Sequence, residues 1–195
     1  MRRTTAGLAL LLSLGFMTPA SAEAQDFRGI IGAGLSVPMG AFGDEDDGAA
    51  KSGGMHGLIG AEWVPAGSYF GLRLDGAYQR FCTTLCEEAE GDLDVKYQIL
   101  HASLTGIGEL KADAPGAFRP YVLVGLGLYN WKLHGDDVPV GFDESETDFG
   151  VNAGLGVNVG FSAASVFLEG RFHNVFTEEE DLQYIPITLG VRFGG

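Results

Sequence analysis

Long apolar runs and helical periodicity are both scarce in this sequence. The apolar run Leu8–Met17 is well short of the roughly 18 residues that a membrane-spanning helix needs, and no later stretch is long enough either. No convincing 3.6-residue repeat of apolar residues follows Asp26, and only 19% of the residues are charged. These absences exclude a helical membrane anchor within the chain and make an ordinary helical domain a poor fit.

Basic residues are also scarce. The chain has 12 lysines and arginines against 26 aspartates and glutamates, a formal net charge of −14. A polyanion would be repelled by such a chain, so nucleic acid is excluded as a partner.

The N-terminus has the features of a secretory signal peptide. Arg2 and Arg3 precede the apolar run Leu8–Met17, and small residues follow at Ala20, Ala22 and Ala24. The sequence therefore predicts a signal peptide over residues 1–24, cleaved after Ala22 or Ala24, and one exported domain over residues 25–195.

From Asp26 onward, apolar and polar or small residues alternate with a period of two. The segment 147–161, "TDFGVNAGLGVNVGF", has Phe, Val, Ala and Leu on one face and Asp, Gly and Asn on the other. This alternation is typical of β-strands with two different surroundings. Strands are predicted at 26–38, 54–64, 69–81, 95–110, 118–131, 147–161, 165–176 and 183–193.

The predicted connections alternate between long and short. The long ones, at 39–53, 82–94, 132–146 and 177–182, hold 18 of the 26 acidic residues. The short ones are at 65–68, 111–117 and 162–164. Long loops at one end and short turns at the other are typical of a transmembrane β-barrel.

The polar face distinguishes this barrel from a soluble, lipocalin-like one. A strand surface that faces water is usually rich in Lys, Glu, Thr and Gln, whereas this one is mostly Gly and Asn with single charges. Small residues suit the narrow interior of an eight-stranded barrel, so the apolar face is expected to contact lipid.

Aromatic residues gather near the predicted strand ends, as expected of two interfacial girdles. The expected girdle residues are Trp63, Tyr69, Phe70, Phe118, Tyr121 and Phe161 by the short turns, and Tyr78, Phe81, Tyr129, Trp131, Phe149 and Phe176 by the long loops.

The last strand, "YIPITLGVRFGG", has an apolar face that ends on Phe193, and "RPYVLVGLGLY" (119–129) is a Gly-rich alternating strand. With the signal peptide, these features make the whole exported chain resemble the small outer-membrane β-barrel family, of the outer-membrane protein A and X type. The resemblance implies an all-β fold: an eight-stranded antiparallel up-and-down transmembrane β-barrel, monomeric and without a cofactor. It also implies contact with outer-membrane lipid and lipopolysaccharide, and recognition of the C-terminal strand by the barrel-assembly machinery.

The alternation directs a set of charged side chains into the barrel. They are Glu62, Arg73, Asp75, Glu169, Arg171 and His173, with His56 and Arg192 as additions. Isolated buried charges are costly, so we expect an ion-pair network that plugs the lumen. A gated or proton-coupled path through the same residues is the alternative.

An enzyme is a further alternative, because some barrels of this size act on lipid A. His101 and Ser103 are two residues apart on one predicted strand, the spacing found in the lipid A deacylase of this kind. The flanking residues do not match that family, and a nucleophile also needs an oxyanion site.

Two cysteines, Cys82 and Cys86, frame "CTTLC" in the second long connection. An exported chain meets an oxidising compartment, so these residues are predicted to form a disulfide.

Acidic clusters in the long connections include Asp44, Asp46, Asp47, Glu178 and Glu180. They are expected to form a solvated rim, with weak binding of Mg²⁺ or Ca²⁺ as a further hypothesis, because hard cations favour carboxylates.

The sequence therefore predicts an outer-membrane protein with periplasmic termini and acidic extracellular loops. Its expected role is structural or interactive, in membrane integrity, adhesion or recognition. Porin activity ranks low because eight strands rarely leave an aqueous path.

Overall fold

The computed structural model describes residues 26–43, 53–82, 96–110, 118–134, 145–161, 164–178 and 180–194. The predicted signal peptide, Cys86, Asp44, Asp46 and Asp47 lie outside these residues. The elements are β1 (Asp26–Met39), the 3₁₀-helix η1 (Gly40–Gly43), β2 (Gly54–Val64), β3 (Phe70–Cys82), β4 (Lys96–Glu109), β5 (Phe118–His134), β6 (Ser145–Gly160), β7 (Ala164–Val175) and β8 (Leu182–Phe193).

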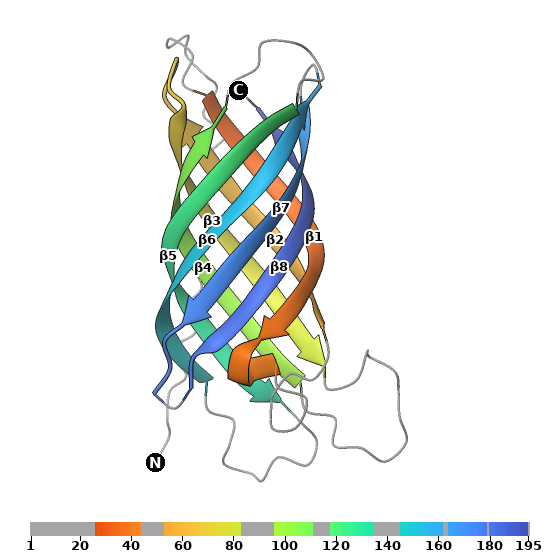
Figure 1. Ribbon diagram of the computed structural model, residues 1–195, viewed down its shortest axis with the longest axis vertical. Helices are drawn as coiled ribbons and strands as arrows, with labels where there is room; N and C mark the ends of the chain where they lie inside the picture. The colour runs from red at the N-terminus through yellow and green to blue at the C-terminus, as the bar shows by residue number, and fades with distance from the viewer. Residues whose placement is uncertain are drawn as a thin grey trace, which may run out of the picture.

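The eight strands form a closed antiparallel barrel in chain order, as Figure 1 shows. Each strand pairs with the next, and β8 closes the barrel against β1, from Gly29 opposite Phe193 to Met39 opposite Gln183. The predicted fold is confirmed, and each predicted strand boundary lies within three residues of the observed one.

The two faces of the barrel wall differ as the alternation predicts. Leu155 on β6, Ile59 on β2 and Val124 on β5 are each about two-thirds exposed on the outer face. On β7, Val166, Leu168 and Phe172 face outward, whereas Phe167 is buried in the lumen. Closure pairs the backbone groups of every strand, which is the condition for an apolar outer surface to contact lipid.

A small apolar layer closes the lumen at the end that carries η1, the lower end in Figure 1. Phe42 of η1 packs edge-on against Phe81 of β3, with ring centroids 5.2 Å apart. Ile99, Tyr129, Val175 and Tyr184 complete this layer. Among the described residues, no helix has the length and apolarity needed to cross a membrane.

Two lumen-facing glycines make room for aromatic rings. A Cβ atom at Gly156 would lie 2.4 Å from Cζ of Tyr121, and a Cβ atom at Gly190 would lie 2.4 Å from Cζ of Phe167. Contacts this short are not tolerated in a packed interior. The lack of a side chain at Gly156 and Gly190 therefore leaves room for the rings of Tyr121 on β5 and Phe167 on β7.

Candidate functional site

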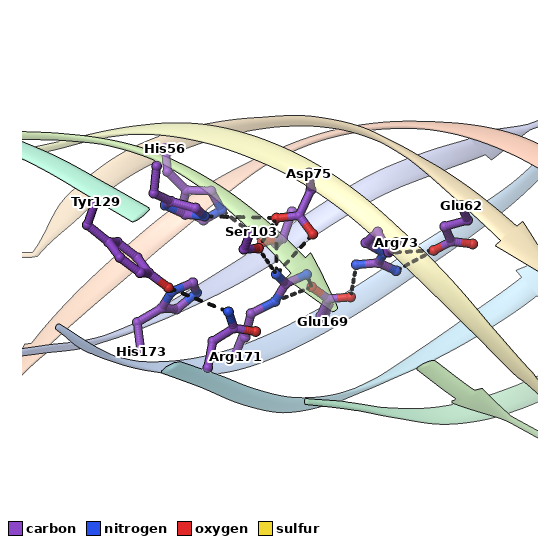
Figure 2. Close-up of polar contacts among 12 residues, drawn as sticks. His56, Glu62, Arg73, Asp75, Ser103, Tyr129, Glu169, Arg171 and His173 are labelled. Carbon is purple, nitrogen blue, oxygen red and sulfur yellow. Dashed lines mark hydrogen bonds and ion pairs between the residues drawn. The ribbon is translucent and has the colours of Figure 1, made fainter. Parts of the chain in front are cut away.

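The centre of the lumen holds a chain of buried charges (Figure 2). Glu62 and Arg73 are opposite each other in the β2–β3 register, and Arg73 donates from Nε to Glu62 at 2.8 Å. Arg73 also donates from Nη1 to Oε2 of Glu169 on β7, at 2.7 Å. One guanidinium thus joins carboxylates from two walls of the barrel.

The chain continues from Glu169 to Asp75. Arg171, two residues along β7, donates from Nη2 to Oε1 of Glu169 at 2.7 Å and from Nη1 to Oδ1 of Asp75 at 3.1 Å. Ser103 on β4 donates to the same Asp75 oxygen at 2.9 Å. The carboxylates therefore receive charge-assisted hydrogen bonds, which are stronger than neutral ones.

A second group of charges lies toward the end where β1 begins. Arg192 donates from Nη1 to Oε2 of Glu109 at 2.6 Å, and its Nε lies 3.5 Å from Oε1 of Glu62. Arg28 and Arg119 also lie within ion-pair distance of Glu109. Arg192 thus links this group to the central chain.

Among the described residues, the almost fully buried charges of the lumen balance. Three buried carboxylates, Glu62, Asp75 and Glu169, face three buried guanidiniums, Arg73, Arg171 and Arg192. Each is almost fully buried, so pairing is required to offset the loss of hydration.

His173 lies in the lumen beside the apolar layer and contacts two tyrosines of that layer. His173 lies 2.8 Å from the hydroxyl of Tyr129 through Nδ1 and stacks on the ring of Tyr184 at 4.8 Å. Among the described side chains, His173 has no recorded ion pair with a carboxylate. His173 thus lies in the lumen, but it belongs to this aromatic cluster rather than to the central chain.

His56, which was expected in the ion-pair network, contacts hydroxyls instead. Its Nδ1 lies 3.0 Å from Oγ of Ser36, and its Nε2 lies 2.8 Å from Oγ1 of Thr188. Ser36 in turn donates to Gln79 at 3.1 Å. Ser36, Thr188 and Gln79 are uncharged, so a search of the sequence for buried charges did not identify them.

Four aromatic residues contradict the predicted girdles: Tyr121, Phe81, Tyr129 and Trp131, which is partly buried against the apolar layer. Tyr121, Phe81 and Tyr129 are almost fully buried in the lumen, not at the lipid interface. Tyr121 donates to Oε2 of Glu169 at 2.8 Å and is thus part of the charged network. On β5 both faces are rich in apolar and glycine residues, so the alternation did not reveal that the odd-numbered residues face inward.

His101 and Ser103 both lie inside the lumen, and both are almost fully buried. Ser103 donates its hydroxyl hydrogen to Asp75, while Nδ1 of His101 lies 3.4 Å from Nε2 of Gln79. No hydrogen bond joins Ser103 and His101 among the described contacts. The deacylase alternative therefore gains no support from this geometry.

The other candidate residues lie at the edges of the described ranges or outside them. Cys82 ends β3 and its side chain is not described, so the predicted disulfide with Cys86 stays a prediction. Glu178 and Glu180 are exposed between β7 and β8. Within the described ranges, no group of three or more His, Cys, Asp or Glu side chains is arranged to hold a metal ion.

Comparison with known proteins gives one family and several structures. The family model for the outer membrane protein beta-barrel domain matches residues 8–193. No curated protein matches the chain.

Three solved structures show the fold. Neisserial surface protein A is 18% identical, with a TM-score of 0.60 over 87% of this chain and 97% of that chain. Ail of Yersinia pestis, solved with the heparin analogue sucrose octasulfate, is 14% identical, with a TM-score of 0.55 over 87% of this chain and 100% of that one. A major outer membrane protein of Thermus thermophilus is 12% identical, with a TM-score of 0.54 over 88% of this chain and 99% of that one.

Proposed function

Since the chain belongs to the outer membrane protein beta-barrel domain family, we propose that it is a structural and surface-interaction protein of the outer membrane with a closed lumen. The observation that carries this proposal is the balanced chain of ion pairs from Arg192 to Asp75. Side chains that fill the lumen in this way support a structural role for the barrel rather than a role as a pore.

The orientation is part of the proposal. The signal peptide directs export, the short turns and both termini face the periplasm, and the acidic long connections face outward. The concentration of acidic residues in these connections supports a role in recognition or adhesion at the cell surface. Divalent cations would then screen them from anionic lipopolysaccharide.

Conductance and stability together test the closed lumen. The wild-type protein in a planar bilayer is expected to show no steady single-channel current. Replacing Arg171 with Met leaves Asp75 and Glu169 without one partner, so the variant should unfold at a lower urea concentration, because an uncompensated buried charge is costly. If the Arg171→Met variant were as stable as the wild-type protein and also conducted ions, the proposal that the ion pairs plug the lumen would be contradicted.

Surface labelling tests the orientation. An epitope inserted between residues 138 and 139 should be detected on intact cells, whereas one inserted between 113 and 114 should be detected only after the outer membrane is opened. Adhesion of the same cells to a surface, measured with and without the protein, then tests recognition. Equal labelling of both insertions on intact cells would contradict the proposed orientation.

A further inference from the structure

A cavity of about 370 Å³ lies at the end of the barrel that carries η1. Its lining includes Tyr97 at the start of β4 and Trp131 near the end of β5. These residues continue the lumen-facing rows of their strands beyond Ile99 and Tyr129, which belong to the apolar layer. The cavity is therefore separated from the charged chain by that layer and opens away from the lumen.

Three aromatic rings form the apolar part of the cavity: Phe42, Tyr97 and Trp131. Phe42 is almost fully buried, and its ring packs edge-on to Tyr97 with centroids 5.5 Å apart. The indole of Trp131 donates from Nε1 to Oδ2 of Asp148 at 2.7 Å. The ring positions are thus held by packing and by a hydrogen bond.

Four carboxylates line the same cavity: Glu146, Glu178, Glu180 and Asp181. Glu146 of β6 is opposite Trp131 in the β5–β6 register. The other three follow β7, where Thr177 donates to the backbone carbonyl of Glu180 and Asn174 donates to Asp181 at 3.0 Å. Among the described side chains, none of these four carboxylates has a recorded ion pair with an arginine, lysine or histidine.

We propose that this cavity binds a small organic cation, an ammonium or guanidinium group attached to an apolar body. Ring faces attract cations, and the effect is largest for indole. The four carboxylates attract the same charge from solution. An anion would be repelled, and a hydrated metal ion would use the carboxylates but gain little from the rings.

The size of the cavity fits this class of ligand. Small-molecule sites usually have volumes of about 300–1,000 Å³, and the volume of this cavity, about 370 Å³, lies within that range. Leu182 and Phe42 can cover the apolar body, while the carboxylates stay near the charge. The extracellular location of the cavity depends on the proposed function, whereas binding to the purified protein does not.

Fluorescence of Trp131 provides a direct measurement. The chain has two tryptophans, and the other, Trp63, is at the far end of β2. In a Trp63→Phe variant purified from membranes, benzyltrimethylammonium should change Trp131 emission saturably. Benzyl alcohol, a smaller neutral compound with the same benzyl group, should bind at least about tenfold more weakly, because it lacks the charge. Calorimetric titration of the unmodified protein checks that Trp63→Phe leaves binding unchanged.

A pair of double variants tests the carboxylates. Glu178→Gln with Glu180→Gln should weaken benzyltrimethylammonium binding about tenfold or more, since two nearby charges are lost. Glu178→Asp with Glu180→Asp keeps both charges and should stay within about threefold of the parent on the same ground. Heat-dependent migration in gels shows that each variant is folded.

Four outcomes would overturn the proposal: no saturable change with benzyltrimethylammonium, equal binding of benzyl alcohol, unchanged binding in the folded Gln variant, or binding of Mg²⁺ that benzyltrimethylammonium does not displace. None of these would alter the conductance and surface-labelling results, so failure here is distinguishable from failure of the proposed function.

Discussion

Arg73 and Glu169 are 96 positions apart in the sequence, yet Nη1 of Arg73 lies 2.7 Å from Oε2 of Glu169 across the lumen. Arg73 comes from β3 and Glu169 from β7, strands that do not pair with each other. The contact therefore crosses the interior rather than following the wall. Arg171 of β7 and Asp75 of β3 form a second buried ion pair between the same two strands, so two ion pairs couple these sides of the barrel.

Replacing Arg73 with Met should destabilise the barrel by about 3–5 kcal/mol, because Glu62 and Glu169 then lose a buried partner. Urea unfolding in detergent micelles measures the change. Combining Arg73→Met with Glu169→Gln should cost less than the sum of the single changes, since the two side chains interact directly. Strict additivity would show that this pair is not coupled.

Gly156→Ala should destabilise the barrel by about 1–3 kcal/mol, because the new methyl group would overlap the ring of Tyr121. Gly170→Ala on β7 is the matched control, since no atom lies within 4 Å of the position of its Cβ. In thermal unfolding, the Gly156→Ala variant should have a lower melting temperature than the Gly170→Ala variant. A Gly156→Ala variant as stable as the Gly170→Ala variant would argue that Tyr121 does not occupy this space.

Leu155→Arg should lower the free energy of unfolding by about 2–4 kcal/mol if the outer face of β6 lies in the bilayer centre. Phe161→Arg, just after the end of β6, should lower it by only about 0–1 kcal/mol. The measurement is reversible unfolding from lipid vesicles. Equal costs at both positions would be inconsistent with a lipid-facing strand.

The two cysteines should give no free thiol in the protein purified without reductant, because exported cysteines this close in sequence form a disulfide. Thiol titration in denaturant measures this, and two thiols should appear after reduction. Cys82→Ser with Cys86→Ser should lower stability only modestly, since the closed loop is short. Two free thiols before reduction would refute the pairing.

Much of the fold could be predicted, since period-two alternation is a local property of the chain. On β7, the inward positions of Glu169, Arg171 and His173 follow from Phe172 and Leu168 facing outward. Strand β5 shows the limit of this reasoning. Its two faces are too similar in composition, so Tyr121 and Tyr129 were assigned to the lipid interface although both lie in the lumen.

The sequence by itself determined the number of strands, their closure into a barrel and the separation of a lipid face from a polar lumen, because these depend on alternation and on the backbone hydrogen bonds that lipid cannot provide. The tertiary structure alone decided which charges pair, that His173 stacks on Tyr184, and that Phe42, Tyr97 and Trp131 form one cavity. These contacts join strands that are distant in the sequence, and the stagger of the closed barrel sets which side chains share a level of the lumen.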